Sequence, residues 1–254
     1  MSKTILFSNL KGGVGKTTST VSTAACLARL GFKCLIIDLD PQGNASQTLG
    51  LSESSFTISD ILINGDGIKA LPISENLVAI PCNFFFARFE TEAKDRLRRE
   101  EILKSALEPI KGRCDFILID CPPSLGLATV NAYACADLIV IPMEAQRFAV
   151  EGLNKVLELI QAIKSELNPL LDFGGILFTR HRKNVILNKD ILNEMREKYP
   201  NTFDAIIREN VALREAPHEN KTILDYDPES NGSKDYMKFS NELLNRMGYE
   251  QEVV

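Results

Sequence analysis

A glycine-rich turn joins the first apolar run of the chain, residues 4–8, to its first Ala-rich helical segment, residues 17–30. Glycines let successive backbone N–H groups point inward around phosphate oxygens, and the start of a helix adds the positive end of its dipole. Lys16 is placed to reach terminal phosphates, and the Thr17 hydroxyl is placed to bind Mg²⁺. A plain turn between a strand and a helix does not need Gly-Lys-Thr-Thr at the helix start. The pattern therefore predicts a phosphate-binding loop, which reads Asn9-Leu10-Lys11-Gly12-Gly13-Val14-Gly15-Lys16-Thr17-Thr18.

Short apolar runs alternate with segments of helical period along the whole chain, a pattern typical of β/α units and a mainly parallel sheet. Several runs are almost continuously apolar, which indicates strands covered on both faces. No Pro/Gly/Ser-rich linker divides the 254 residues, so we expect one α/β domain, residues 1–254, with the P-loop NTPase fold: a mainly parallel twisted sheet with helices on both faces. We expect strands at residues 4–8, 34–38, 77–80, 116–120, 138–141, 175–178 and 203–207, and helices at residues 17–30, 90–107, 150–167, 188–198 and 234–247.

Composition excludes some classes of protein. The net charge of −5 and pI near 5.3 argue against a protein that coats nucleic acid indiscriminately, because that needs a broadly positive surface; a local basic patch stays possible. The six cysteines include no C-x-x-C pair and no cysteine–histidine cluster at metal-ligand spacing, so we expect buried reduced thiols. Without a signal-like segment or an apolar stretch of membrane-spanning length, the expected location is cytoplasmic.

Carboxylates follow two of the expected strands. Asp38 and Asp40, two residues apart on an extended chain, share a face at the carboxyl edge of the sheet, where such sheets bind ligands. A turn-capping role for Asp38 is the alternative. Asp120 ends the apolar run 116–119, the Walker B arrangement that holds magnesium directly or through water. We therefore expect Thr17, Asp38 and Asp120 on the metal side of the site.

The phosphate loop departs from the ordinary G-x-x-x-x-G-K-[ST] pattern, because Leu10 occupies the position of its first glycine and Lys11 stands next to it. In this it resembles the deviant P-loop of the ParA/MinD ATPases. The resemblance implies ATP and Mg²⁺ as cofactors, and it implies that Lys11 reaches the partner's nucleotide across a dimer interface. The nucleotide-binding residues implied by the motif are Lys11, Gly12, Gly13, Val14, Gly15, Lys16, Thr17 and Thr18.

Three further segments extend the resemblance over essentially the whole chain. Residues 36–44 resemble the family's switch I, in which the second aspartate orients the attacking water, so Asp40 is the expected hydrolytic residue beside Lys11 and Lys16. Residues 120–124 resemble its switch II. Residues 208–217 resemble the P-R-N-x-x-L-x-E-A-P segment of Soj-type ParA proteins, whose proline and asparagine contact the adenine end; here these positions are Arg208 and Asn210. Phe84-Phe85-Phe86 departs from the family pattern and is interpreted as core or dimer surface.

The resemblance implies a DNA segregation ATPase. We expect its intrinsic turnover to be slow, because a switch that fired without its partner would waste the bound state. Its ATP-dependent homodimer would bind double-stranded DNA non-specifically, associate with the nucleoid, and be released when a ParB-type centromere-binding protein stimulates hydrolysis. Because the phosphate loop begins about ten residues into the chain, we expect no preceding helix-turn-helix domain. The richest basic cluster is the candidate DNA surface, although scattered surface charge explains most such clusters; it comprises Arg180, Arg182, Lys183, Lys189, Arg214 and Lys221.

Two other functions are alternatives to DNA segregation. A MinD-like or other cargo-positioning ATPase acting at a membrane needs a C-terminal amphipathic helix with a basic face, whereas residues 245–254 are acidic and interrupted by glycine; no membrane partner is expected. An iron–sulfur carrier on the same fold needs cysteines that meet at a dimer axis, and Cys121 and Cys135 are the plausible pair.

Overall fold

The computed structural model describes residues 2–146, 149–182 and 186–249. Within them an eight-stranded sheet has the order β3-β4-β2-β5-β1-β6-β7-β8, and every neighbouring pair is parallel except β3 and β4. The strand that carries the phosphate loop, β1, lies between two strands that come more than 100 residues later. The strands are β1 (Lys3–Phe7), β2 (Cys34–Asp38), β3 (Leu71–Ser74), β4 (Leu77–Ile80), β5 (Phe116–Asp120), β6 (Leu138–Glu144), β7 (Asp172–His181) and β8 (Thr202–Arg208).

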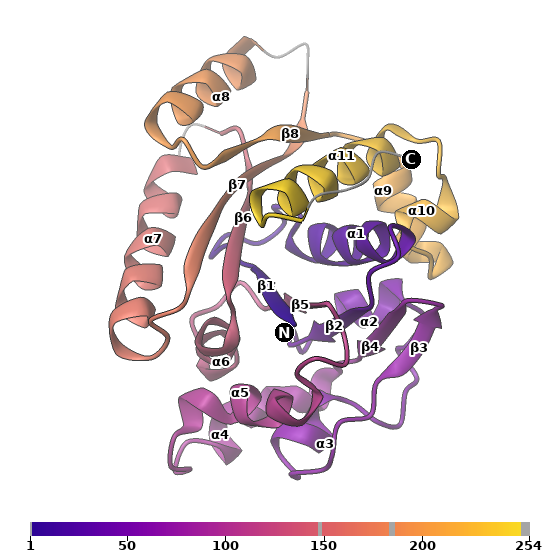
Figure 1. Ribbon diagram of the computed structural model, residues 1–254, viewed down its shortest axis with the longest axis vertical. Helices are drawn as coiled ribbons and strands as arrows, with labels where there is room; N and C mark the ends of the chain where they lie inside the picture. Colours follow the sequence, from indigo (N-terminus) through magenta and orange to yellow (C-terminus); the bar gives the residue numbers. More distant parts are fainter. Residues whose placement is uncertain (1, 147–148, 183–185, 250–254) are drawn as a thin grey trace.

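Helices cover both faces of the sheet (Figure 1). One face carries α1 (Lys16–Arg29), α2 (Asn44–Thr48), α9 (Ala212–Glu215), α10 (Ile223–Tyr226) and α11 (Asn231–Arg246). The other carries α3 (Ile58–Leu62), α4 (Phe89–Glu92), α5 (Ile102–Leu107), α6 (Leu127–Cys135), α7 (Ala149–Glu166) and α8 (Ile186–Lys198). The predicted fold class is thereby confirmed.

The central strands supply side chains to two hydrophobic cores, one on each side of the sheet. In β1, Ile5 and Phe7 enter the core beneath α1 and α11, whereas Leu6 enters the core beneath α6 and α7. All five residues of β2 and all five of β5 are buried. This double burial explains why these strands read as continuous apolar runs instead of alternating ones.

Several elements differ from the prediction, which also lacks the short helices α2, α3, α9 and α10. The expected helix at residues 90–107 is wrong: α4 and α5 are separated by turns and a short 3-10 helix (Arg99–Glu101), before which Arg98 has a left-handed φ of 55°. Helix α6 was not predicted, because its Ala-rich run is apolar on nearly every side and lacks helical periodicity. Strand β3 was missed because it is a half-buried antiparallel edge strand containing Pro72.

The Phe84-Phe85-Phe86 run divides between core and surface. Phe86 is buried and stacks on Phe89 with ring centroids 5.1 Å apart. Phe84 and Phe85 are 75% and 61% exposed. The core interpretation is therefore confirmed for Phe86, and a dimer surface stays a prediction for Phe84 and Phe85.

Candidate active site

The phosphate loop leaves the carboxyl end of β1 and is fastened to two other strands. The Asn9 side chain accepts a hydrogen bond from Lys11 N (3.0 Å) and donates one to Pro142 O on β6 (2.8 Å). On β7, the Thr179 hydroxyl donates to Val14 O (2.8 Å). Gly15 adopts a left-handed φ of 87° directly before α1, a conformation that favours glycine. The turn predicted from the sequence thus opens the first helix and is anchored on both sides.

A cavity of about 420 Å³ lies over this loop. The Lys16 side chain reaches back over the loop, so that its Nζ donates to Lys11 O (3.2 Å), and the residue is only 7% exposed. Asp40 lines the same cavity, is 8% exposed, and accepts a hydrogen bond from Gln42 N (2.9 Å). The cavity therefore combines a buried ammonium group, a helix N-terminus and a carboxylate, as a hydrolytic phosphate site requires. From the loop itself, it is lined by Gly12, Gly13, Gly15, Lys16, Thr17 and Thr18.

Strands β2 and β5 bring two carboxylates together, because Asp38 and Asp120 are paired in register. Asp38 accepts hydrogen bonds from Ser46 Oγ (2.7 Å), Ser46 N (2.9 Å) and Asp40 N (3.0 Å). Burial nevertheless raises the pKa of Asp38 to about 6. The Ser46 hydroxyl in turn accepts a hydrogen bond from Cys82 N (2.8 Å). The Asp38 carboxylate is therefore occupied by hydrogen bonds that stabilise the start of α2. This favours the turn-capping role of Asp38 over direct contact with a metal ion.

Asp120 has the opposite environment. It is fully buried, and among the described residues neither carboxylate oxygen has a hydrogen-bond partner of ordinary geometry. Burial, followed by the negative charge of Asp38, raises its pKa well above the usual value, and the nearby Thr17 hydroxyl and Lys16 ammonium offset only part of this. A buried carboxylate without partners, beside a helix-start hydroxyl, fits a divalent cation or its water shell.

The protein would supply only part of such a cation's coordination shell. Among the described residues, no group of three or more His, Cys, Asp or Glu side chains is arranged to hold a metal ion. Mg²⁺ is usually held by one or two protein ligands together with substrate phosphates and water. Thr17 and Asp120 fit that arrangement.

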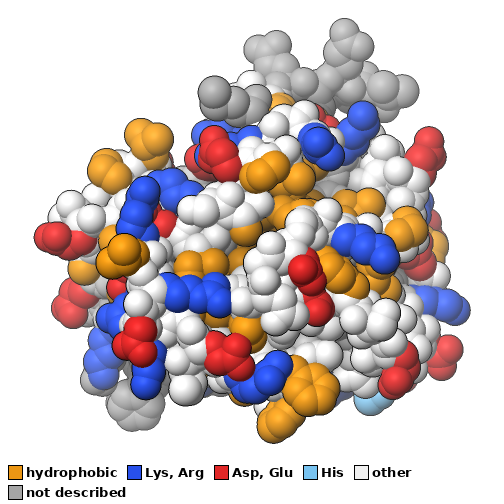
Figure 2. Space-filling model, turned by 90° about the horizontal axis from the view of Figure 1, so that it is seen from below, with side chains coloured by type: hydrophobic (Ala, Val, Ile, Leu, Met, Phe, Trp, Pro, Cys, Tyr) orange, Lys and Arg blue, Asp and Glu red, His pale blue; other side chains and the backbone are white. Residues whose placement is uncertain are grey.

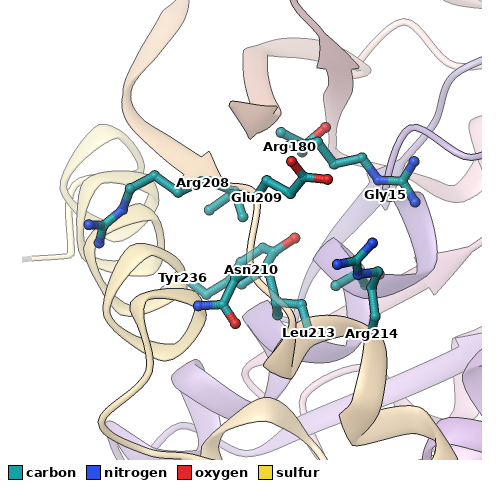
Figure 3. Close-up of a pocket in the computed structure, with 11 residues that line it drawn as sticks. Gly15, Arg180, Arg208, Glu209, Asn210, Leu213, Arg214 and Tyr236 are labelled. Carbon is teal, nitrogen blue, oxygen red and sulfur yellow. The ribbon is translucent and has the colours of Figure 1, made fainter. Parts of the chain in front are cut away.

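A second, smaller cavity of about 130 Å³ adjoins the phosphate loop (Figure 3). Apolar side chains of Ile207, Leu213 and Tyr236 line it. Asn210 also lines it, and its Oδ1 accepts a hydrogen bond from Ala212 N (2.8 Å), which orders the start of α9. A cavity with these walls, which shares Gly15, Thr18 and Arg180 with the cavity over the phosphate loop, suits the flat base of a nucleotide.

Arg208 does not offer its side chain to this cavity. Its guanidinium points away toward α11 (Figure 3) and pairs with Asp235, with Nη2 and Oδ1 2.6 Å apart. Arg208 N donates to the same carboxylate (2.9 Å). The residue therefore lines the cavity through its backbone, and a side-chain contact with the base has no support in the structure.

The described residues of the basic cluster lie in different surroundings. Arg180 and Arg214 line the cavity with apolar walls (Figure 3), and both are exposed, so a DNA contact for them stays a prediction. Arg182 is exposed but paired with Glu209, and Lys221 is exposed beyond α9. Lys183 lies outside the described residues, as does the side chain of Lys189. Figure 2 shows acidic and basic side chains interspersed over another face of the molecule.

Lys11 is engaged within its own chain. Its Nζ donates to Gln146 Oε1, and Gln146 Nε2 donates to Glu144 Oε2. Glu144 Oε1 also accepts a hydrogen bond from Arg180 Nη1 (3.1 Å). Sequence reasoning missed Gln146, Glu144 and Thr179, because each binds a residue far along the chain and no local motif marks it. It also missed Ser46, which binds Asp38 only eight residues earlier but lies just outside the recognised segment 36–44.

The iron–sulfur alternative gains no support. Cys121 follows β5 at the carboxyl edge of the sheet, whereas Cys135 ends α6, which runs back to the amino edge. Burial raises the pKa of both thiols to about 12, which opposes the thiolate form that binds metal.

Comparison with known proteins identifies the family. A family profile described as an AAA domain matches residues 2–173. The chain is 39% identical over 250 residues to the sporulation initiation inhibitor protein Soj of Bacillus subtilis, covering 96% of this chain and 98% of that protein. It is 40% identical over 253 residues to the chromosome-partitioning ATPase Soj of Treponema pallidum, covering 98% and 99%. The chain belongs to the ParA/Soj family of partition ATPases.

Solved structures agree with this assignment. Cobyrinic acid a,c-diamide synthase of Mycobacterium smegmatis with a bound ATP analogue and magnesium has a TM-score of 0.86, at 26% identity, over 99% of this chain and 98% of that one. A putative plasmid partition protein of Borrelia burgdorferi bound to AMPPNP has a TM-score of 0.76, at 28% identity, over 97% and 98%. These ligands match the cofactors that the sequence predicts, ATP and Mg²⁺. No helix among the described residues has the length and apolar character needed to cross a membrane.

Proposed function

We propose that this chain is an ATP-hydrolysing DNA segregation protein whose ATP-bound dimer binds double-stranded DNA without sequence preference. The observation that carries the proposal is that Lys16 and Asp40 line one cavity, with the buried carboxylate of Asp120 next to it. The loop beneath this cavity also bears the additional lysine, Lys11. The names of its full-length relatives support a role in partition.

Each residue has a role that follows from its position. The backbone N–H groups of residues 12–15 and the Lys16 ammonium bind the terminal phosphates. Thr17 and Asp120 hold Mg²⁺, which when bound neutralises phosphate charge, and Asp38 keeps the start of α2 in place. Asp40 orients the attacking water from the rim of the cavity. Positioning and charge stabilisation are most of what phosphoryl transfer needs from a protein.

Lys11 connects the site to dimerisation. Its ammonium is held by Gln146 of the same chain, so it does not reach its own phosphate cavity in this conformation. In a face-to-face dimer, exchange of this contact for the partner's nucleotide would make dimerisation depend on ATP. Two chains would also double a basic surface that is too small to bind DNA alone.

The DNA surface is proposed to include Arg182, Lys183, Lys189 and Lys221, whereas Arg180 and Arg214, which line the base cavity, are proposed to act on the nucleotide. Release from DNA would follow hydrolysis stimulated by a ParB-type partner. The ATP-bound form would then be found on the nucleoid and the released form in the cytoplasm.

The test uses Asp40→Ala, which should bind ATP, hydrolyse it poorly and accumulate as a dimer. Binding to non-specific duplex DNA is measured with ATP and with ADP across a salt series. ATP-dependent, salt-sensitive binding is expected, because phosphate contacts release counterions. Lys16→Ala, which should fail to bind ATP productively, is the matched control. Equal DNA binding with both nucleotides, or none with either, would refute the proposal.

A further inference from the structure

Arg180 stands where the two cavities of the site meet. It lines both the cavity over the phosphate loop and the cavity with apolar walls, and it shares this position with Gly15 and Thr18. If phosphates occupy the first cavity and a base occupies the second, the residues common to both lie beside the part of the nucleotide that joins them. That part is the sugar with its attached phosphate.

The side chain of Arg180 is held in place there. Its Nη1 donates to Glu144 Oε1 (3.1 Å), and the Glu144 side chain is only 18% exposed, against 55% for Arg180. The backbone of Arg180 has a left-handed φ of 50°, which is uncommon for a residue with a side chain. The backbone conformation of Arg180 and its hydrogen bond to the largely buried Glu144 together fix the direction of the guanidinium group, while about half of the side chain stays exposed to solvent.

A second guanidinium lies on the same side of the cavity. The side chains of Arg180 and Arg214 both extend toward the side where Gly15 lies (Figure 3). The Arg214 side chain is exposed, and it forms no hydrogen bond or ion pair with another side chain among the described residues. Glu209 also lines this cavity, but it is bound by Arg182, which with the other two arginines lowers its pKa. The positive charge beside the loop is therefore not fully compensated.

We propose that Arg180, positioned by Glu144, is a nucleotide-contacting residue that binds the phosphate nearest the sugar, with Arg214 adding positive charge. This inference rests on the proposed ATP-binding function and deepens it. Arginine presents several N–H donors in a planar fork, which suits phosphate oxygens better than a lysine point charge. The contact would serve ATP and ADP alike, unlike Lys11 and Lys16, which act on the terminal phosphates.

The experiment compares ATP and ADP affinity, by calorimetry in the presence of Mg²⁺, for the wild type, Arg180→Ala, Arg180→Lys and Glu144→Gln. Arg180→Ala should weaken both nucleotides by a similar factor of about ten, the effect of one charge-assisted hydrogen bond at a half-exposed group. Arg180→Lys should recover part of the loss. Glu144→Gln keeps the guanidinium but weakens its anchor, so its loss should be smaller than that of Arg180→Ala.

Arg88→Ala is the matched control, because the Arg88 side chain is 60% exposed, pairs with Glu92, and lines neither cavity. It should bind both nucleotides as the wild type does. Unchanged affinities in Arg180→Ala, or a loss confined to ATP, would overturn the inference, provided that the melting temperatures without nucleotide match. Failure of the wild type itself to bind either nucleotide would instead refute the proposed function.

Discussion

Replacing Asp120 with asparagine should stabilise the nucleotide-free protein while impairing its activity. In the wild type a fully buried carboxylate has no hydrogen-bond partner of ordinary geometry and faces the charge of Asp38. Each unit by which the folded-state pKa exceeds the ordinary value costs the charged carboxylate about 1.4 kcal/mol, and an asparagine of similar volume removes that cost. At about 2–4 °C per kcal/mol for a chain of this size, a gain of about 2 kcal/mol corresponds to a rise in Tm of about 4–8 °C.

The effect should depend on pH in a defined direction. Because the pKa of Asp120 is raised on folding from the ordinary value of 3.8, the folded protein retains a proton that the unfolded chain has already lost. Wild-type stability therefore falls as pH rises from about 4 through the raised folded-state pKa. The advantage of Asp120→Asn should be small near pH 4 and largest above that window.

Urea unfolding of both proteins at several pH values, without nucleotide, measures this difference. Asp38→Asn is the matched control: Asp38 accepts three hydrogen bonds, so an amide NH₂ would oppose a donor and destabilise the fold by about 1–3 kcal/mol. Added Mg²⁺ and ATP should stabilise the wild type more than Asp120→Asn. An Asp120→Asn protein that is less stable than the wild type, or whose advantage does not change with pH, would refute the reasoning.

Three other substitutions are informative. Lys16→Ala should abolish productive nucleotide binding, since the phosphates lose their main cation; unchanged ATP affinity in calorimetry would contradict this. Ser46→Ala should destabilise the fold by about 2–4 kcal/mol in urea unfolding, because it removes a bond to the buried Asp38 carboxylate and leaves Cys82 N unpaired. Gly175→Ala should cost about 3 kcal/mol or more, because at φ 137° its Cβ would lie 2.0 Å from Asn201 O; a wild-type melting temperature would show that this backbone relaxes.

Much of the architecture could be predicted from the sequence because short local patterns mark the buried strands and the start of the first helix. Buried parallel strands such as Phe116–Asp120 are short apolar runs that end in polar residues. The Gly-Lys-Thr-Thr run indicates the start of α1. The helix expected at residues 90–107 failed because helical periodicity does not detect a break such as the left-handed Arg98. Tertiary packing decided the conformation there.

The candidate site was predictable only where one motif holds its residues together. Lys16, Thr17 and Asp120 belong to recognisable patterns, and the structure brings them together at the carboxyl edge of the sheet. Arg180 and Arg214 read as surface charge because nothing nearby in the sequence shows that β7 and α9 converge on the same cavity. Likewise, Asp235, which binds the Arg208 guanidinium outside the base cavity, lies 27 residues further along the chain.

The strand order also has a consequence for synthesis of the protein on the ribosome. The phosphate loop emerges within the first 18 residues, but the strands on either side of β1 follow about 100 residues later, and the walls of the base cavity come from residues 179–236. Chains grow at roughly 5–20 residues per second, so a complete nucleotide cleft forms only after residues 179–236 have been synthesised. Nucleotide can therefore act as a late folding ligand, and an incomplete chain should leave the ribosome without the capacity to dimerise on ATP.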